Sequence, residues 1–120
     1  MRKKRKVAAP VLTFSLDEEL AQLRKEPEWL AGDRNSVTLA KTPDLGIVLV
    51  SLRKGAAICG HEVDGPITVT TLEGAIAFRA GRKKRILRRG DMLALGKAIP
   101  HDVEAVKESA FVLTIVRQAA

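Results

Sequence analysis

The side chains best suited to chemistry in this chain are two histidines and one cysteine. His61 and His101 are the only histidines, and Cys59 is the only cysteine. An imidazole can transfer a proton near neutral pH or bind a transition metal, and a thiolate binds zinc and other soft metals. Residues two apart on a strand share a face, so Cys59, His61 and Val63 are expected to point to one side.

These residue types leave two interpretations open. Cys59 is either a small buried hydrophobic residue or a third metal ligand beside the two histidines. His61 and His101 are either a hydrogen-bonded pair in a pocket or the ligands of a bound ion. Two neutral imidazoles alone are a poor site for a divalent ion, which needs three or four protein donors. The lone cysteine excludes an intramolecular disulfide framework and favours a reducing compartment, so we expect a cytoplasmic protein.

The elements that must position these residues are short strands. The chain has 120 residues and is 46% hydrophobic, which suffices for one core. From residue 36 onward, strand-like segments alternate with turn residues, and no helical segment separates them, which excludes a doubly wound parallel sheet. This pattern predicts an all-β sandwich or barrel. The predicted strands are 36–41, 46–53, 57–61, 67–72, 75–80, 83–87, 92–95, 102–106 and 110–117.

One short helix is predicted before the strands. Ser15 followed by Glu18 forms a capping box, a leucine stripe runs over residues 16–23, and Pro27 is expected to end the helix. An isolated helix of this length cannot bury its apolar face, so it is expected to cover a sheet of this chain or of a partner. Residues 1–13 are predicted to be a basic flexible tail, and residues 14–120 a single domain.

Two short motifs resemble those of the small single-domain cupins of the RmlC-like type. Gly55 to His61 match the opening G-x5-H of the first cupin motif, and Gly74 matches its closing glycine. In the second motif, the initial glycine and the histidine match Gly90 and His101. The resemblance spans residues 37–116 and implies a double-stranded β-helix, a jelly-roll barrel with a pocket inside. It also implies a homodimer.

This chain keeps only two of the four metal-ligand positions of that family. The family's metal is usually held by three histidines and one glutamate; His61 and His101 match two of these, whereas Val63 and Ile67 replace the second histidine and the glutamate. The predicted pocket is therefore largely apolar, lined by Cys59, Val63 and Ile67, with His61 and His101 as its polar groups. The expected cofactor is none or, alternatively, one weakly held divalent ion (Zn, Fe, Mn or Ni) on His61 and His101.

These residues predict a non-enzymatic cupin-like protein that binds a small ligand, because the barrel offers no nucleophile beyond Cys59 and no carboxylate that can be placed inside. By analogy with the family, the alternative is a metal-dependent isomerase or dioxygenase using His61 and His101. A third hypothesis is a regulatory sensor whose basic hairpin, residues 82–89, contacts nucleic acid or an acidic partner.

The basic charge is concentrated in two runs. The net charge is +7, and without the eleven cations of residues 2–6 and 82–89 it falls to −4. No aromatic residues alternate with these runs, so they are interpreted as solvated charge, with no specific nucleic-acid partner. The longest strongly apolar stretch, residues 45–52, is far shorter than a membrane span of about 20 residues. No membrane association is therefore predicted.

Overall fold

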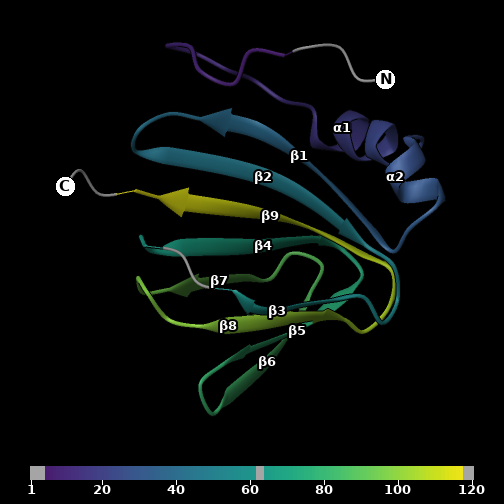
Figure 1. Cartoon of the computed structure of the whole chain (residues 1–120), viewed down its shortest axis with the longest axis vertical. Coiled ribbons are helices and arrows are strands. Elements are labelled where there is room, and N and C mark those ends of the chain that lie inside the picture. The colour runs from purple at the N-terminus through teal and green to yellow at the C-terminus, as the bar shows by residue number, and fades with distance from the viewer. Residues whose placement is uncertain (1–4, 62–63, 118–120) are drawn as a thin grey trace.

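The computed structural model describes residues 5–61 and 64–117, which form two antiparallel sheets stacked face to face (Figure 1). All nine strands predicted from the sequence occur in the described residues, each end within two residues of its predicted place. The strands are β1 (Arg34–Lys41), β2 (Leu45–Leu52), β3 (Ala57–His61), β4 (Ile67–Glu73), β5 (Ala75–Ala80), β6 (Lys83–Arg88), β7 (Met92–Leu95), β8 (His101–Ala105) and β9 (Ser109–Val116).

The order of the strands is that of a jelly roll. One sheet has the order β1-β2-β9-β4-β7 and the other the order β3-β8-β5-β6. Every pair of neighbouring strands is antiparallel. The chain crosses from one sheet to the other after β2, β3, β4, β6, β7 and β8, so neither sheet is a simple meander. The predicted all-β jelly-roll barrel, a double-stranded β-helix, is therefore confirmed.

Apolar side chains from the facing sides of both sheets fill the space between them. They include Val69 and Phe111 from one sheet and Ile76, Phe78 and Val103 from the other, each at most 4% exposed. Each such side chain stabilises the fold by about 1.5–3 kcal/mol relative to an exposed position. The middle of the barrel is therefore occupied by the protein's own side chains, and a ligand would have to bind nearer its rim.

Two short helices, α1 (Leu16–Leu23) and α2 (Pro27–Leu30), lie on the outer side of the five-stranded sheet (Figure 1). The hydroxyl of Ser15 accepts a hydrogen bond from the amide of Glu18 at 3.4 Å, which caps α1 as predicted. Leu20 and Leu23 are buried against β1 and β2 of the same chain. Pro27 does not end α1, which stops at Leu23, but begins α2, because its fixed φ suits the first helical position.

No helix in residues 5–61 and 64–117 is long and apolar enough to cross a membrane.

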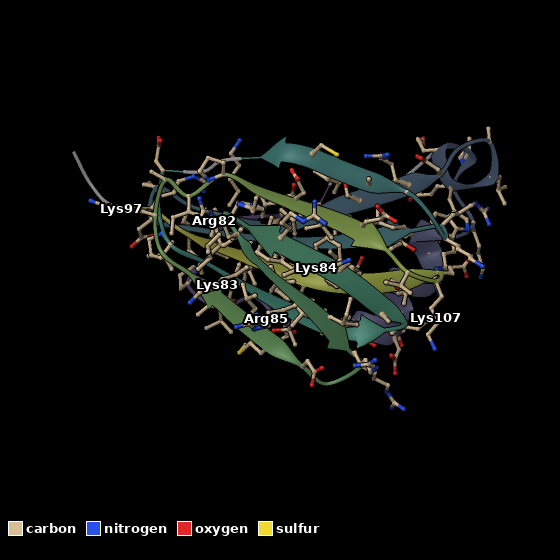
Figure 2. All side chains as sticks on the ribbon, turned by 90° about the horizontal axis from the view of Figure 1, so that it is seen from below. Arg82, Lys83, Lys84, Arg85, Lys97 and Lys107 are labelled. Atoms are coloured by element: carbon tan, nitrogen blue, oxygen red, sulfur yellow. The ribbon has the colours of Figure 1, made fainter. Side chains whose placement is uncertain are left out.

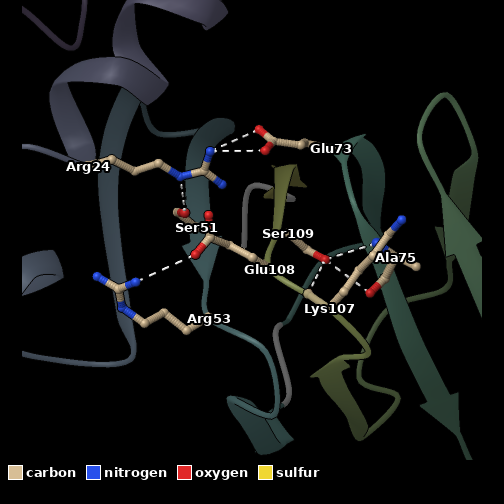
Figure 3. A network of polar contacts seen from close by, with 8 residues as sticks. All are labelled: Arg24, Ser51, Arg53, Glu73, Ala75, Lys107, Glu108 and Ser109. Atoms are coloured by element: carbon tan, nitrogen blue, oxygen red, sulfur yellow. Dashed lines mark hydrogen bonds and ion pairs between the residues drawn. The ribbon is translucent and has the colours of Figure 1, made fainter.

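A polar network fastens the helices to one end of the barrel (Figure 3). The Arg24 guanidinium lies 2.9 Å from the Glu73 carboxylate and donates to the Ser51 hydroxyl at 3.1 Å. The guanidinium groups of Arg24 and Arg53 lie 5.4 and 4.1 Å from the ring of Trp29. Such contacts couple α1 and α2 to the five-stranded sheet, and they place these charges in a structural role.

Residues 5–13 belong to the segment predicted to be a flexible tail, and two of them contact the folded body. The Arg5 guanidinium pairs with the Glu19 carboxylate at 2.7 Å, and the Lys41 amide donates to the Val7 carbonyl at 2.7 Å. Because β1 is an edge strand, the second contact covers part of a free sheet edge. The boundary between tail and domain after residue 13 stays a prediction.

Candidate functional site

His101 is the buried polar residue around which the candidate site is built. It begins β8 and is 4% exposed, and its ring stacks on Phe78 with centroids 5.2 Å apart and planes 15° from parallel. Its Nδ1 lies 3.0 Å from the carbonyl oxygen of Ile99. Because a carbonyl can only accept, Nδ1 carries the proton and donates. In the neutral ring, Nε2 then holds the lone pair that can accept a proton or a hydrogen bond.

The loop before His101 contains a residue in an unusual conformation. Ala98 has a φ of +57°, in the left-handed region that disfavours side chains with a Cβ. The sequence has alanine here where the second cupin motif has glycine. The hydrogen bond from His101 to Ile99, the next residue, helps to hold the strained turn in place.

A β-bulge brings His61 opposite His101. Between the pairs Ile58–Val103 and His61–His101, β3 has one residue more than β8. Gly60 sits in this bulge with a φ of +64°, and its amide donates to the Asp102 carboxylate at 2.6 Å. The two histidines are therefore partners in backbone register. The side chain of His61 lies outside the described residues.

The bulge also explains why Cys59 is not where the sequence places it. Cys59 is exposed, and with Arg79 and Glu104 it lines a hollow of about 300 Å³ on the outer face of the four-stranded sheet. The prediction that it is a buried residue of the barrel lining is wrong, because simple two-residue alternation does not hold across a bulge. Val63 lies outside the described residues.

Ile67 lies on the inner face of the five-stranded sheet. It is 2% exposed and stands in register between Leu95 of β7 and Ile115 of β9. All three side chains belong to the apolar core or pack against it. The three side chains at this position are therefore all apolar, and none of them has a donor atom for a metal ion.

A hollow near these residues opens between the β5–β6 hairpin and β7, and we call it the mouth. Its volume is about 380 Å³. It lies at the rim of the barrel, beside the core and not within it, and the described residues that line it have no carboxylate, thiol or hydroxyl group. The lining residues are Phe78, Ala80, Lys83, Arg85, Leu93, Ala94, Leu95 and Ile99.

Cross-strand register connects the mouth to His101. Ala80 of β5 pairs with His101 of β8 on one side and with Lys83 of β6 on the other. Phe78, whose ring stacks on His101, pairs with Arg85. Directly opposite residues in an antiparallel pair share a face, so His101, Ala80 and Lys83 form one row on the inner side of the sheet.

Sequence reasoning missed the two cations of the mouth. Residues 82–89 are predicted to be solvated charge, and Lys83 and Arg85 are exposed, but they also alternate with Lys84 and share the face of the buried Leu87. Figure 2 shows Lys83 and Arg85 along β6 on the side of β7, with Lys84 over the outer face of the sheet. The signal was available: counting back in twos from Leu87 gives Arg85 and Lys83.

Comparisons with solved structures agree with the fold described above, whereas comparisons of sequence find no match. No family model and no curated protein sequence matches the chain. A conserved protein of unknown function from Streptococcus pyogenes has a similar structure, with a TM-score of 0.73 and 24% identity over 99% of this chain and 98% of that one. A cupin 2 conserved barrel domain protein from Leptotrichia buccalis has a TM-score of 0.69 and 29% identity over 72% of this chain and 42% of its own. This chain has the cupin fold.

Similar structures also include an enzyme. A mutant of salicylate 1,2-dioxygenase from Pseudoaminobacter salicylatoxidans matches with a TM-score of 0.79 and 16% identity, covering 94% of this chain and 37% of that one. At this identity the likeness shows the fold alone. The cupin fold thus occurs in proteins of unknown function and in enzymes, and the chemistry must be argued from this chain's own residues.

The described residues do not form the metal site that cupins often carry. Ile67 stands at the position of the family's glutamate and has no donor atom. Within residues 5–61 and 64–117, no three His, Cys, Asp or Glu side chains gather closely enough to hold an ion. Cys59, which could have completed a set with the histidines, lies exposed on the outer face.

Proposed function

We propose that this cupin-fold protein binds a small, largely apolar organic molecule in the mouth and does not catalyse a reaction on it. The observation that carries the proposal is an open apolar hollow directly beside the buried His101, in a barrel whose middle is filled. A volume of about 380 Å³ lies within the range of small-molecule sites. The rings and chains of Phe78, Leu93 and Leu95 offer the ligand an apolar floor.

His101 packs against Phe78, one of the residues that form this apolar floor. It is stacked on Phe78 and hydrogen-bonded to the Ile99 carbonyl, and both of those residues line the mouth. Its role in the proposal is to fix the mouth in one shape, which lowers the cost of ordering side chains when a ligand binds. Among the described residues, the lining has no carboxylate, thiol or hydroxyl group, which supports binding over catalysis.

The test is a titration with benzamide, a small neutral aromatic probe, followed through backbone amide NMR shifts. We expect a dissociation constant of about 1 mM, since so few heavy atoms contribute. The shifts should concentrate at Ala80, Leu95 and Ile99. The substitution Ala80→Leu fills the mouth and should weaken binding at least about tenfold, the effect of losing roughly 1.4 kcal/mol of contact.

The matched control is Ala77→Leu. Ala77 lies on the same strand but lines the outer hollow beside Cys59, so this variant adds the same side chain on the opposite face. It should bind benzamide as the unmodified chain does. Equal losses in the two variants, or shifts confined to the outer face, would contradict the proposed site.

The alternative, a metal-dependent enzyme using His61 and His101, has a direct test. Elemental analysis of protein purified without a histidine tag should find no stoichiometric transition metal. One ion per chain that disappears in His101→Ala would overturn the non-enzymatic proposal. The homodimer, the absence of a specific nucleic-acid partner and the cytoplasmic location stay predictions.

A further inference from the structure

We propose that the mouth selects small organic acids, in which a carboxylate contacts Lys83 and Arg85 while an apolar body lies on the floor. This inference rests on the proposed function and names its ligand class. It comes from the placement of two cations on a face that is otherwise apolar. In register across the sheet, Arg85 is opposite Phe78 and Lys83 is opposite Ala80.

The inner face of β6 changes character along its length. Leu87 is buried in the core, whereas the next two inner positions toward the mouth, Arg85 and Lys83, carry positive charge. An aliphatic residue at either position would continue the apolar row that Phe78 and Ala80 begin on β5. The two cations instead stand at the rim of an apolar hollow, where both side chains are exposed and can meet the carboxylate of a ligand whose apolar body lies in the hollow.

Neither cation has an acidic partner among the described residues. In the part of the chain that the structure describes, no carboxylate lies within ion-pairing distance of Lys83 or Arg85. One guanidinium nitrogen of Arg85 donates to the Lys84 carbonyl at 3.0 Å, which leaves its other donors for a ligand. Among the described residues that line the mouth, Lys83 and Arg85 are the charged ones, so this lining contributes positive charge and no negative charge.

A purely structural explanation competes with this inference. β6 is the edge of the four-stranded sheet, and charged residues that point inward on an edge strand discourage edge-to-edge aggregation. That explanation predicts cations but no ligand preference. The two explanations therefore differ in whether the removal of these charges changes binding or changes self-association.

The experiment compares benzoate with benzamide, which differ mainly in charge. Benzoate should bind about tenfold more tightly at low salt, and the preference should shrink as salt screens the rim. In the double variant Lys83→Gln and Arg85→Gln, benzoate affinity should fall to that of benzamide, and benzamide affinity should stay unchanged. The control, Lys84→Gln with Arg88→Gln, removes the same charge from the outer face of the same strand and should keep the preference.

The outcomes separate this inference from the proposed function. Benzamide binding in the mouth without a preference for benzoate would overturn the ligand class and leave the site intact. Binding of neither probe there would overturn both. Equal losses of benzoate affinity in the two double variants would attribute the preference to net charge, and aggregation of the Lys83 and Arg85 variant with unchanged benzoate affinity would assign these side chains to edge protection.

Discussion

Replacement of Gly74 by alanine tests the turn that joins β4 to β5 in opposite sheets. Gly74 has a φ of +81°, in the left-handed region. A Cβ at this position would lie 2.8 Å from the Cα of Ser109 and closer still to the Glu108 carbonyl oxygen and the Ser109 hydroxyl. The Ser109 hydroxyl accepts from the amide of Ala75 at 2.9 Å, so relief of the clash must disturb this buried contact (Figure 3).

The expected cost has two parts. A residue with a Cβ in this conformation costs about 1–2 kcal/mol relative to glycine. Displacement of the β8–β9 turn weakens the hydrogen bonds around Ser109, each with a net value of about 1 kcal/mol. We therefore expect Gly74→Ala to lower the free energy of unfolding by about 3–4 kcal/mol in total.

Gly81→Ala is the matched control. Gly81 also has a positive φ, +60°, but an added Cβ would meet nothing within 4 Å. It should therefore show only the conformational part, about 1–2 kcal/mol. Urea unfolding followed by the fluorescence of Trp29, the only tryptophan and a buried one, measures both variants. Equal destabilisation by the two substitutions would refute the steric reasoning at Gly74.

Two further substitutions test contacts near the site and at the opposite end of the barrel. Asp102→Ala removes the acceptor of the Gly60 amide in the bulge, so this amide should exchange its hydrogen about tenfold faster, and an unchanged exchange rate would contradict the role given to Asp102. Arg24→Met keeps the apolar stem of the side chain but removes the donor to Ser51 and the pair with Glu73. Urea unfolding should show a loss of about 1–2 kcal/mol, whereas a more stable variant would show that desolvation of Arg24 outweighs these contacts.

Most of the fold could be predicted because its signals are local. Each strand is bounded by turn residues such as Gly74 and Gly81, whose positive φ values occur where the sequence predicts turns. The capping box at Ser15 likewise predicts where α1 begins. Pro27 was misjudged because proline disfavours a helix interior and suits a first turn equally well, and the sequence alone did not decide between the two.

The site could be predicted only in part because it depends on contacts between distant segments. Cys59 follows Ile58, which packs against the core, so Cys59 lies on the outer face; the bulge between Ile58 and His61 then breaks the two-residue alternation that predicts one face for Cys59 and His61. Nothing local to Cys59 signals that bulge except Gly60. Lys83 and Arg85 lie in a run of like charges, whose composition suggests exposure to solvent. Only the alternation about Leu87 indicates that these two residues are on the inner face of the sheet.

The most direct test of the account is a crystal of this chain soaked with 4-bromobenzoate, whose bromine is located by its anomalous scattering. The account predicts a single strong bromine peak in the mouth, over Phe78 and Leu95, with the carboxylate toward Lys83 and Arg85. A peak on the outer face beside Cys59, or a ligand bound in the mouth with its carboxylate turned away from both cations, would contradict it.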